Sequence, residues 1–224
     1  MREEREELSD PLTNVLGDLA PADRDHALTL LRACKAIELE PGVPCFPNAF
    51  PADALLLVDD GFVVLRASVG GAVRSAVTGE AGPGNVLLAP AWTEVLIGLG
   101  RSRVKVIDAT ARAELLTVPA LADALVQQLA LALRQKQEAL ANFAPAHHVD
   151  RVRGKLLQLA ASYGHVVRDG VRIDFPVSHA LLAEMIGSSR ETVTRAVAQL
   201  ERASFIDRRG STYRLLVSPQ SVRV

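Results

Sequence analysis

Residues 178–202 decide the fold of the C-terminal part of the chain: Ser178-His-Ala-Leu-Leu-Ala-Glu-Met-Ile-Gly-Ser-Ser-Arg-Glu-Thr-Val-Thr-Arg-Ala-Val-Ala-Gln-Leu-Glu-Arg202. Ser178 is suited to cap a first helix, and Gly187 supplies a tight turn after it. Ser188 followed by Glu191 is the pattern of a capping box, which begins a second helix. Each helix has one apolar side, formed by Leu181, Leu182 and Met185 in the first and by Val193, Val197 and Leu200 in the second. The stretch therefore predicts a helix-turn-helix.

The opposite side of the second helix carries polar side chains that suit DNA bases, namely Arg190, Glu191, Thr194 and Arg195. A helix in the major groove presents its first residues to base edges, where arginine binds guanine and a carboxylate accepts a hydrogen bond from cytosine. An Arg/Glu pair also occurs on merely solvated helices, so its place at the start of a capped second helix carries the prediction. Phosphate contacts are predicted for polar residues near the helix starts and for two arginines beyond them: Ser178, His179, Ser188, Ser189, Thr192, Arg208 and Arg209.

Two predicted hairpins flank this motif. Residues 166–175 alternate apolar and polar side chains around Asp169-Gly170, a strong hairpin signal. Residues 205–217 predict a strand, a turn at Gly210 and a second strand, which together form a wing. Its two arginines could follow the phosphate backbone, and a solvated hairpin tip is the alternative interpretation. An amphipathic helix is predicted over residues 149–163.

The charge is divided unequally along the chain of 224 residues, whose formal net charge is −1. Residues 1–149 have 13 Lys and Arg against 19 Asp and Glu, a net charge of −6. Residues 150–224 have 12 against 7, a net charge of +5. The C-terminal part is therefore the part suited to a polyanion such as DNA.

The N-terminal part predicts an antiparallel β-structure. Short apolar runs recur at a spacing of roughly ten residues, with Gly, Pro and Asp between them, which is typical of a sandwich or barrel. The runs are Leu55–Val58, Phe62–Leu65, Val73–Val77, Val86–Leu88, Val95–Ile97 and Val104–Ile107. The fold class expected for the whole chain is therefore α+β, with an N-terminal antiparallel β-roll similar to a jelly roll.

The residue types of the β-rich part argue against an enzyme or a metal site. It contains no histidine between about residues 36 and 118, whereas a metal-binding jelly roll needs imidazole ligands on its strands. The two cysteines, Cys34 and Cys45, are too few for a four-thiolate cluster. We therefore predict no catalytic residues and no metal site. A jelly-roll enzyme with an accessory nucleic-acid domain is the competing class.

Residues 119–144 predict one long helix without an internal Gly or Pro. Apolar residues recur at spacings of three and four, as in a dimeric coiled coil. We call five of them the dimer seam: Val126, Leu129, Leu133, Leu140 and Phe143. Leu121, Leu125 and Ala132 form a second stripe that is available for the helix's own domain. Packing within a single chain is the alternative to a dimer.

The stretch Ser189-Arg-Glu-Thr-Val-Thr-Arg195, followed by a wing, resembles the regulators of the cyclic-AMP receptor protein and fumarate–nitrate regulator (CRP/FNR) family. The resemblance implies a sensor-like, cyclic-nucleotide-binding-like β-roll over residues 1–118, a dimerisation helix over 119–144 and a winged helix-turn-helix over 145–224. It further implies a homodimer on a palindromic operator with TGTGA-like half-sites. In the receptor-protein branch Arg, Glu and Arg stand at the positions of Arg190, Glu191 and Arg195.

The resemblance weakens in the β-roll. Members that bind cyclic nucleotides have a Gly-Glu pair and an Arg-Ser/Thr pair, whereas this chain has Leu87-Leu88 and no arginine between Arg74 and Arg101. A buried phosphate without a cation is costly, so cyclic AMP is not expected to bind and no cofactor is predicted. Other possibilities are haem held by Cys34, Cys45 or His26, an apolar effector near Trp92, or no effector. Trp92 itself is expected to be a core residue.

The expected setting is the cytoplasm, because the charged N-terminus is unlike a signal peptide and no apolar run is long enough to span a membrane. The expected partners are double-stranded DNA, a second copy of the chain and RNA polymerase, and no membrane. A nonspecific or architectural DNA-binding protein, or one that works without a ligand, is the alternative to a sequence-specific regulator.

Overall fold

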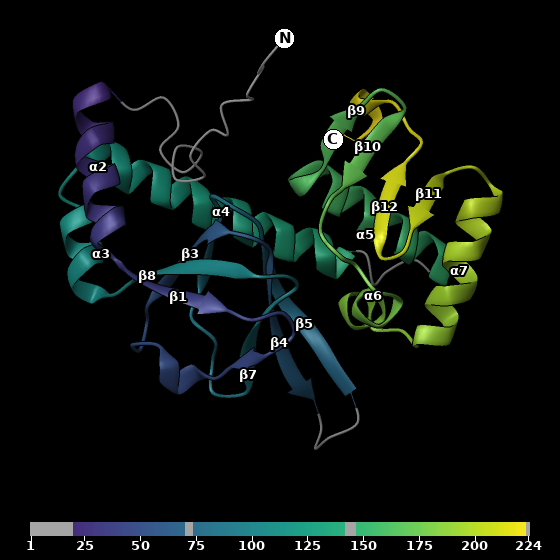
Figure 1. The fold of residues 1–224 in the computed structure, drawn as a ribbon, viewed down its shortest axis with the longest axis horizontal. Coiled ribbons are helices and arrows are strands. Elements are labelled where there is room, and N and C mark those ends of the chain that lie inside the picture. Colours follow the sequence, from purple (N-terminus) through teal and green to yellow (C-terminus); the bar gives the residue numbers. More distant parts are fainter. Residues whose placement is uncertain (1–19, 70–73, 142–146, 223–224) are drawn as a thin grey trace, which may run out of the picture. The chain divides into compact units, whose positions relative to one another are not determined.

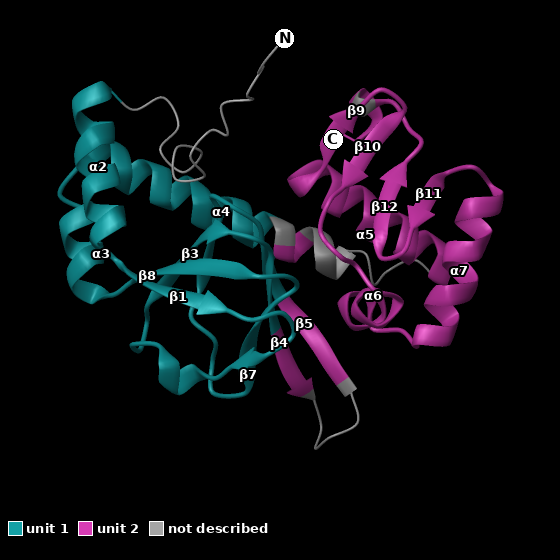
Figure 2. Ribbon diagram, in the orientation of Figure 1, with its two compact units in different colours: residues 1–65, 79–134 teal, residues 66–78, 135–224 magenta. Residues whose placement is uncertain are grey.

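The computed structural model describes residues 20–69, 74–141 and 147–222, which form two compact units (Figure 1). One unit comprises residues 1–65 and 79–134, and the other comprises residues 66–78 and 135–224 (Figure 2). Each unit is considered by itself below. The boundaries predicted at residues 118 and 144 remain predictions, and the second lies beside residues 142–146, outside the described part of the chain.

The β-roll consists of two four-stranded sheets with the orders β1-β8-β3-β6 and β2-β7-β4-β5. The pairs β1–β8, β3–β8, β3–β6 and β2–β7 are antiparallel. The strands are β1 Lys35–Leu39, β2 Pro44–Cys45, β3 Leu55–Asp60, β4 Val63–Val69, β5 Arg74–Ala81, β6 Val86–Leu88, β7 Glu94–Gly98 and β8 Ser102–Ile107, with a 3-10 turn, η1, at Pro47–Ala49. The predicted antiparallel β-roll is confirmed, while β1 and β2 were not among the predicted strands.

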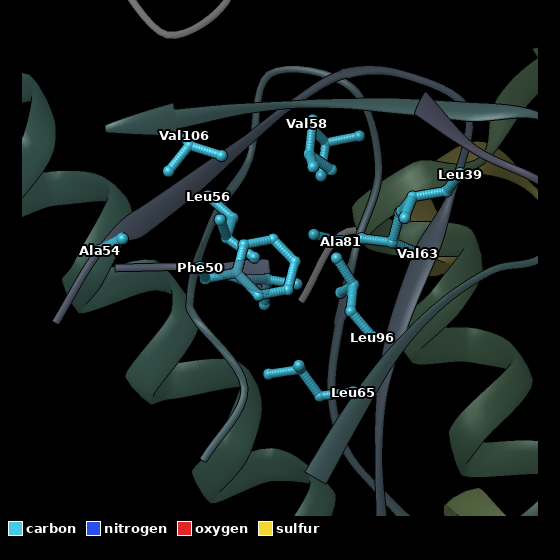
Figure 3. Packing of buried hydrophobic residues seen from close by; sticks show 12 residues of the cluster. Leu39, Phe50, Ala54, Leu56, Val58, Val63, Leu65, Ala81, Leu96 and Val106 are labelled. Carbon is cyan, nitrogen blue, oxygen red and sulfur yellow. The ribbon is translucent and has the colours of Figure 1, made fainter. Parts of the chain in front are cut away.

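Strand β3 lies at the centre of the roll, because it pairs with β8 on one side and β6 on the other. Successive residues of a strand point to opposite faces. Leu55 and Leu57 therefore join one core cluster, which includes helical residues, while Leu56 and Val58 join a second cluster between the sheets (Figure 3). This placement explains why β3 is a continuous apolar run: both of its faces are buried.

Helices cover one face of this sheet. They are α2 Pro21–Ala33, α3 Ala109–Leu115 and the first part of α4 Pro119–Ala141. Leu121 and Leu125 of α4 are buried in the same cluster as Leu55, so the predicted second stripe does pack against its own domain. Among the described helices none is by itself long and apolar enough to cross a membrane. Only the pair Ala109–Leu115 and Pro119–Arg134, bent by 119°, meets the requirements of length and composition together.

The second unit contains the predicted winged helix-turn-helix, whose sheet has the strand order β11-β12-β10-β9 (Figure 1). The elements are α5 His148–Tyr163, β9 His165–Val167, β10 Gly170–Ile173, α6 His179–Ile186, α7 Arg190–Arg202, β11 Ile206–Arg209, β12 Thr212–Leu215 and a 3-10 turn, η2, at Pro219–Ser221. The inner sides of its three helices are buried together with Ile173 and Leu215 of the sheet. Both hairpins occur where the sequence predicts them, and the fold class is confirmed.

Candidate nucleic-acid interface

Helix α6 begins and ends as its sequence predicts. The Ser178 hydroxyl accepts a hydrogen bond from the backbone N–H of Leu181 at 3.1 Å, so Ser178 is the N-cap. Gly187 ends the helix in the left-handed conformation, with φ at 62°, which costs a glycine little. Together these two residues fix the short turn that leads into α7.

Helix α7 begins one residue later than predicted. Its N-cap is Ser189, whose hydroxyl accepts a hydrogen bond from the N–H of Thr192 at 3.2 Å. The capping box from Ser188 to Glu191 is therefore wrong. Glu191 lies one residue too early in the helix for that role, and the Ser188 hydroxyl is instead within 3.1 Å of His148 Nδ1. His148 is a contact of the predicted site that the sequence did not reveal.

The four side chains predicted to contact bases lie together on α7. Arg190, Glu191, Thr194 and Arg195, which we call the reading face, are exposed and line a single open hollow. The opposite side of α7 is buried through Val193, Ala196, Val197 and Leu200. Packing of this apolar side therefore turns the reading face toward solvent.

The charge of the reading face is set by its position at a helix start. Hydrogen bonds from the backbone N–H of Glu191 and from the Ser189 hydroxyl hold the pKa of the Glu191 carboxyl below its usual value. Arg190 and Arg195 act in the same direction. Glu191 is therefore ionised at neutral pH, and a carboxylate accepts hydrogen bonds but does not donate them.

The predicted phosphate contacts have different surroundings. Ser178 and Ser189 use their hydroxyls as helix caps. Thr192 Oγ1 lies 3.0 Å from Ser189 Oγ and accepts a hydrogen bond from Arg195 Nη2 at 3.4 Å. His179 Nδ1 lies 2.8 Å from Thr194 Oγ1, within the helix-turn-helix.

The two wing arginines are not equivalent. Arg208 donates from Nη1 to the carbonyl of Gly210 at 2.9 Å, and its Nε lies 3.5 Å from Glu201 Oε1. Arg209 is exposed, and its side chain has no hydrogen bond or ion pair with the described residues. Arg209 is therefore the freer of the two to contact a phosphate, while Arg208 ties the wing to α7. Glu201 is a second residue that the sequence did not single out.

The connection between β6 and β7 holds a carboxylate against its own backbone. Ala91 donates its backbone N–H to Glu94 Oε2 at 3.0 Å, and the N–H of Glu94 donates to the Ala91 carbonyl at 2.8 Å. The turn thus places a carboxylate, not a cation, on its backbone. Trp92, at its tip, is 90% exposed, so the expectation that it is a core residue is wrong.

An apolar cavity and two cysteines lie in the part of the chain that contains the roll. An apolar cavity of about 10 Å³ lies among side chains from β3, β6, β8 and the three helices, including Leu57 and Leu125. Cys34 and Cys45 are free thiols, and burial raises the pKa of each. Among the described residues no group of three His, Cys, Asp or Glu side chains is arranged to hold a metal ion.

Three residues of the dimer seam, Val126, Leu129 and Leu133, are exposed on α4, in contrast to Leu121 and Leu125. The side chain of Leu140 and all of Phe143 lie outside the described part of the chain. A row of exposed aliphatic residues on one side of a long helix is an unusual use of apolar surface for an isolated chain.

Residues 150–219 match the family model of the Crp-like helix-turn-helix domain. The global nitrogen regulator of Synechococcus elongatus is 34% identical over 88 residues, which are 39% of this chain and 40% of that protein. The CRP-like cAMP-activated global transcriptional regulator of Mycobacterium tuberculosis is 30% identical over 94 residues, 42% of each. The matched part thus spans less than half the length of these curated relatives.

Solved structures share the fold over most of the chain. A CooA variant from Carboxydothermus hydrogenoformans has a TM-score of 0.70 at 16% identity, covering 87% of this chain and 88% of that chain. A cyclic nucleotide-binding domain containing protein from Listeria monocytogenes has a TM-score of 0.71 at 16% identity, covering 87% and 97%. The likeness therefore extends from the C-terminal domain to the β-roll.

Proposed function

We propose that this chain is a transcription regulator of the CRP/FNR family that binds a palindromic DNA operator as a homodimer, because residues 150–219 match the Crp-like helix-turn-helix domain. The observation that carries the proposal is the reading face: four polar side chains gathered on the first two turns of α7, all exposed. The N-terminal turns of a helix are the part that reaches base edges in the major groove. The net charge of +5 over residues 150–224 supports a polyanionic partner.

The proposed dimer forms through the dimer seam of α4. Its described members are exposed on a helix of 23 residues, and a second copy would cover them. A twofold axis places two recognition helices about one DNA turn apart, ~34 Å, so the operator has two half-sites in successive major grooves. By resemblance each half-site is TGTGA-like, with Arg190 and Arg195 on guanines and Glu191 on a cytosine amine.

We further propose that cyclic AMP is not the effector, although one relative is described as cAMP-activated. The carboxylate of Glu94 on the β6–β7 turn repels a phosphate. The sequence has no arginine between Arg74 and Arg101 that could pair with the phosphate instead. The protein works either with another effector or without one. RNA polymerase is the partner through which a bound regulator would act, in the cytoplasm.

The test is selection of bound sequences from random duplex DNA by the purified protein, repeated with candidate effectors. A palindrome with a spacing of about one helical turn is expected. Binding that shows no sequence preference and is abolished by competitor DNA would instead indicate a nonspecific DNA-coating protein, whose affinity is almost wholly electrostatic.

A further inference from the structure

His179 and Thr194 join the two helices of the helix-turn-helix. His179 is the first residue of α6, and Thr194 belongs to the reading face of α7. His179 Nδ1 and Thr194 Oγ1 are 2.8 Å apart. This contact ties a half-buried imidazole to a side chain that the proposed function places against DNA bases.

The protons of this contact can be assigned from the other bonds. The Thr194 hydroxyl has a single proton, which it donates to the backbone carbonyl of Arg190 at 2.9 Å. The proton between Thr194 and His179 therefore belongs to His179 Nδ1, so the imidazole is the donor. His179 Nε2 is buried, and none of the described residues forms a hydrogen bond with it, which suits an unprotonated nitrogen better than an N–H group.

The charges around His179 agree with a neutral ring. Burial is the main cause that lowers the pKa of His179, and the positive charges of Arg208 and Arg190 lower it further. Glu201 acts in the opposite direction without reversing the shift. These groups lie on α7 and on β11 of the wing, the elements that face the ring.

The two hydrogen bonds also determine what Thr194 can offer to a ligand. Its hydroxyl proton is used by the backbone, and one oxygen lone pair is used by His179. A helical threonine can adopt more than one side-chain rotamer because its hydroxyl can bond to the preceding turn. Here both bonds favour the rotamer that turns the oxygen toward the protein. The methyl group is the branch that is left for an outside contact.

From this geometry we propose that His179 is a positioning residue that fixes Thr194 so that its methyl group, not its hydroxyl, meets the DNA and selects the 5-methyl group of a thymine. Apolar contact is the usual way in which a threonine methyl recognises thymine. A free hydroxyl would act as donor or acceptor toward several bases and phosphates, and would discriminate poorly. The inference rests on the proposed function, because it needs α7 to lie in the major groove.

The experiment uses the full-length protein and the operator obtained by selection. The thymines of the two half-sites are replaced one at a time by deoxyuridine, which pairs with adenine but lacks the methyl group. For the wild type we expect one position per half-site at which the replacement weakens binding about fourfold, the effect of one buried methyl group. Thr194→Val keeps a methyl group, so deoxyuridine should weaken its binding by the same factor. Thr194→Ser removes the methyl group, so deoxyuridine should have no effect on its binding.

A matched pair of variants tests the role of His179. In His179→Asn the amide nitrogen takes the place of Nδ1 as a donor, so the preference for thymine over deoxyuridine should persist. In His179→Ala the Thr194 hydroxyl keeps only its bond to the preceding turn, which more than one rotamer can make, so the preference should fall below about twofold. Thermal unfolding of each variant shows that it is folded. Merely structural damage would lower affinity for both DNAs alike and leave their ratio unchanged.

The result that overturns the inference is a Thr194→Ser or His179→Ala protein that distinguishes thymine from deoxyuridine as well as the wild type does. A wild type that selects an operator but shows no deoxyuridine effect at any position also overturns it, while the proposed function stands. A wild type that selects no sequence at all contradicts the proposed function itself. The three failures are therefore distinguishable.

Discussion

The proposed dimer predicts a large effect from the double substitution Leu129→Asp and Leu133→Asp. Leu129 is 40% exposed and Leu133 is 59% exposed, so the two together expose about the surface of one whole leucine per chain. Complete burial of an aliphatic side chain stabilises by ~1.5–3 kcal/mol, so two chains lose about 3–6 kcal/mol of association free energy. The four added carboxylates oppose burial further. The dimer dissociation constant should therefore rise at least about 100-fold.

Sedimentation equilibrium over a concentration series measures this constant, and operator titration under the same conditions measures DNA binding. Leu131→Asp is the matched control. Leu131 is 42% exposed on the same helix, but about 160° around it from both seam leucines. The control should remain a dimer and bind the operator as the wild type does. If the double variant still forms dimers at the wild-type concentration, or the wild type is monomeric at micromolar concentration with and without DNA, the dimer seam is wrong.

Three further predictions concern the DNA interface, the β6–β7 turn and His179. Arg190→Ala should lose roughly 1–3 kcal/mol of DNA-binding free energy per half-site and relax the preference at one G·C pair. Arg209→Ala should weaken binding to all sequences alike and reduce the salt dependence of binding. If Arg190→Ala lost equal affinity for operator and scrambled DNA, Arg190 would be a phosphate contact. Cyclic AMP should give no binding by calorimetry at micromolar concentrations, and a micromolar dissociation constant would contradict the assignment of the β6–β7 turn. Because the pKa of His179 is lowered on folding from 6.5, the unfolded chain binds its proton more readily, so the free energy of unfolding should fall as pH drops below about 6.5. The free energy of unfolding of His179→Asn, measured by thermal unfolding at the same pH values, should fall less. A pH dependence identical to that of the wild type would refute the lowered pKa of His179.

Features that depend on local chemistry were predictable from the sequence. Ser178 caps α6 and Gly187 ends it because a hydroxyl acceptor and a residue tolerant of positive φ are required at those places whatever surrounds them. The Asp169-Gly170 hairpin has the same local origin. The buried stripe of α4 was also predictable, since its period is that of a helix.

Features that depend on a partner strand were not predictable. Lys35–Leu39 has two charged residues among five and only Leu39 is buried, yet it forms β1 because its residues pair with β8 from Lys35 opposite Val106 to Leu39 opposite Ser102. Pro44–Cys45 is a strand of two residues, defined only by its pairing with β7. The expectation for Trp92 was wrong for another reason: an indole suggests a core, but Trp92 lies 90% exposed on the turn that leads from β6 in one sheet to β7 in the other.

His179 shows how tertiary structure changes the interpretation of a site residue. In the sequence it follows a helix cap, a position near phosphates, and a histidine there suggests a cation for DNA. In the fold the same position faces α7, where burial and the charges of Arg208 and Arg190 disfavour a further positive charge and the Thr194 hydroxyl accepts a hydrogen bond instead. Fifteen residues of sequence separate the two side chains, and only the crossing of the two helices brings them together. A neutral imidazole is a poor phosphate ligand but a well-defined donor, so what His179 contributes to DNA recognition passes through Thr194.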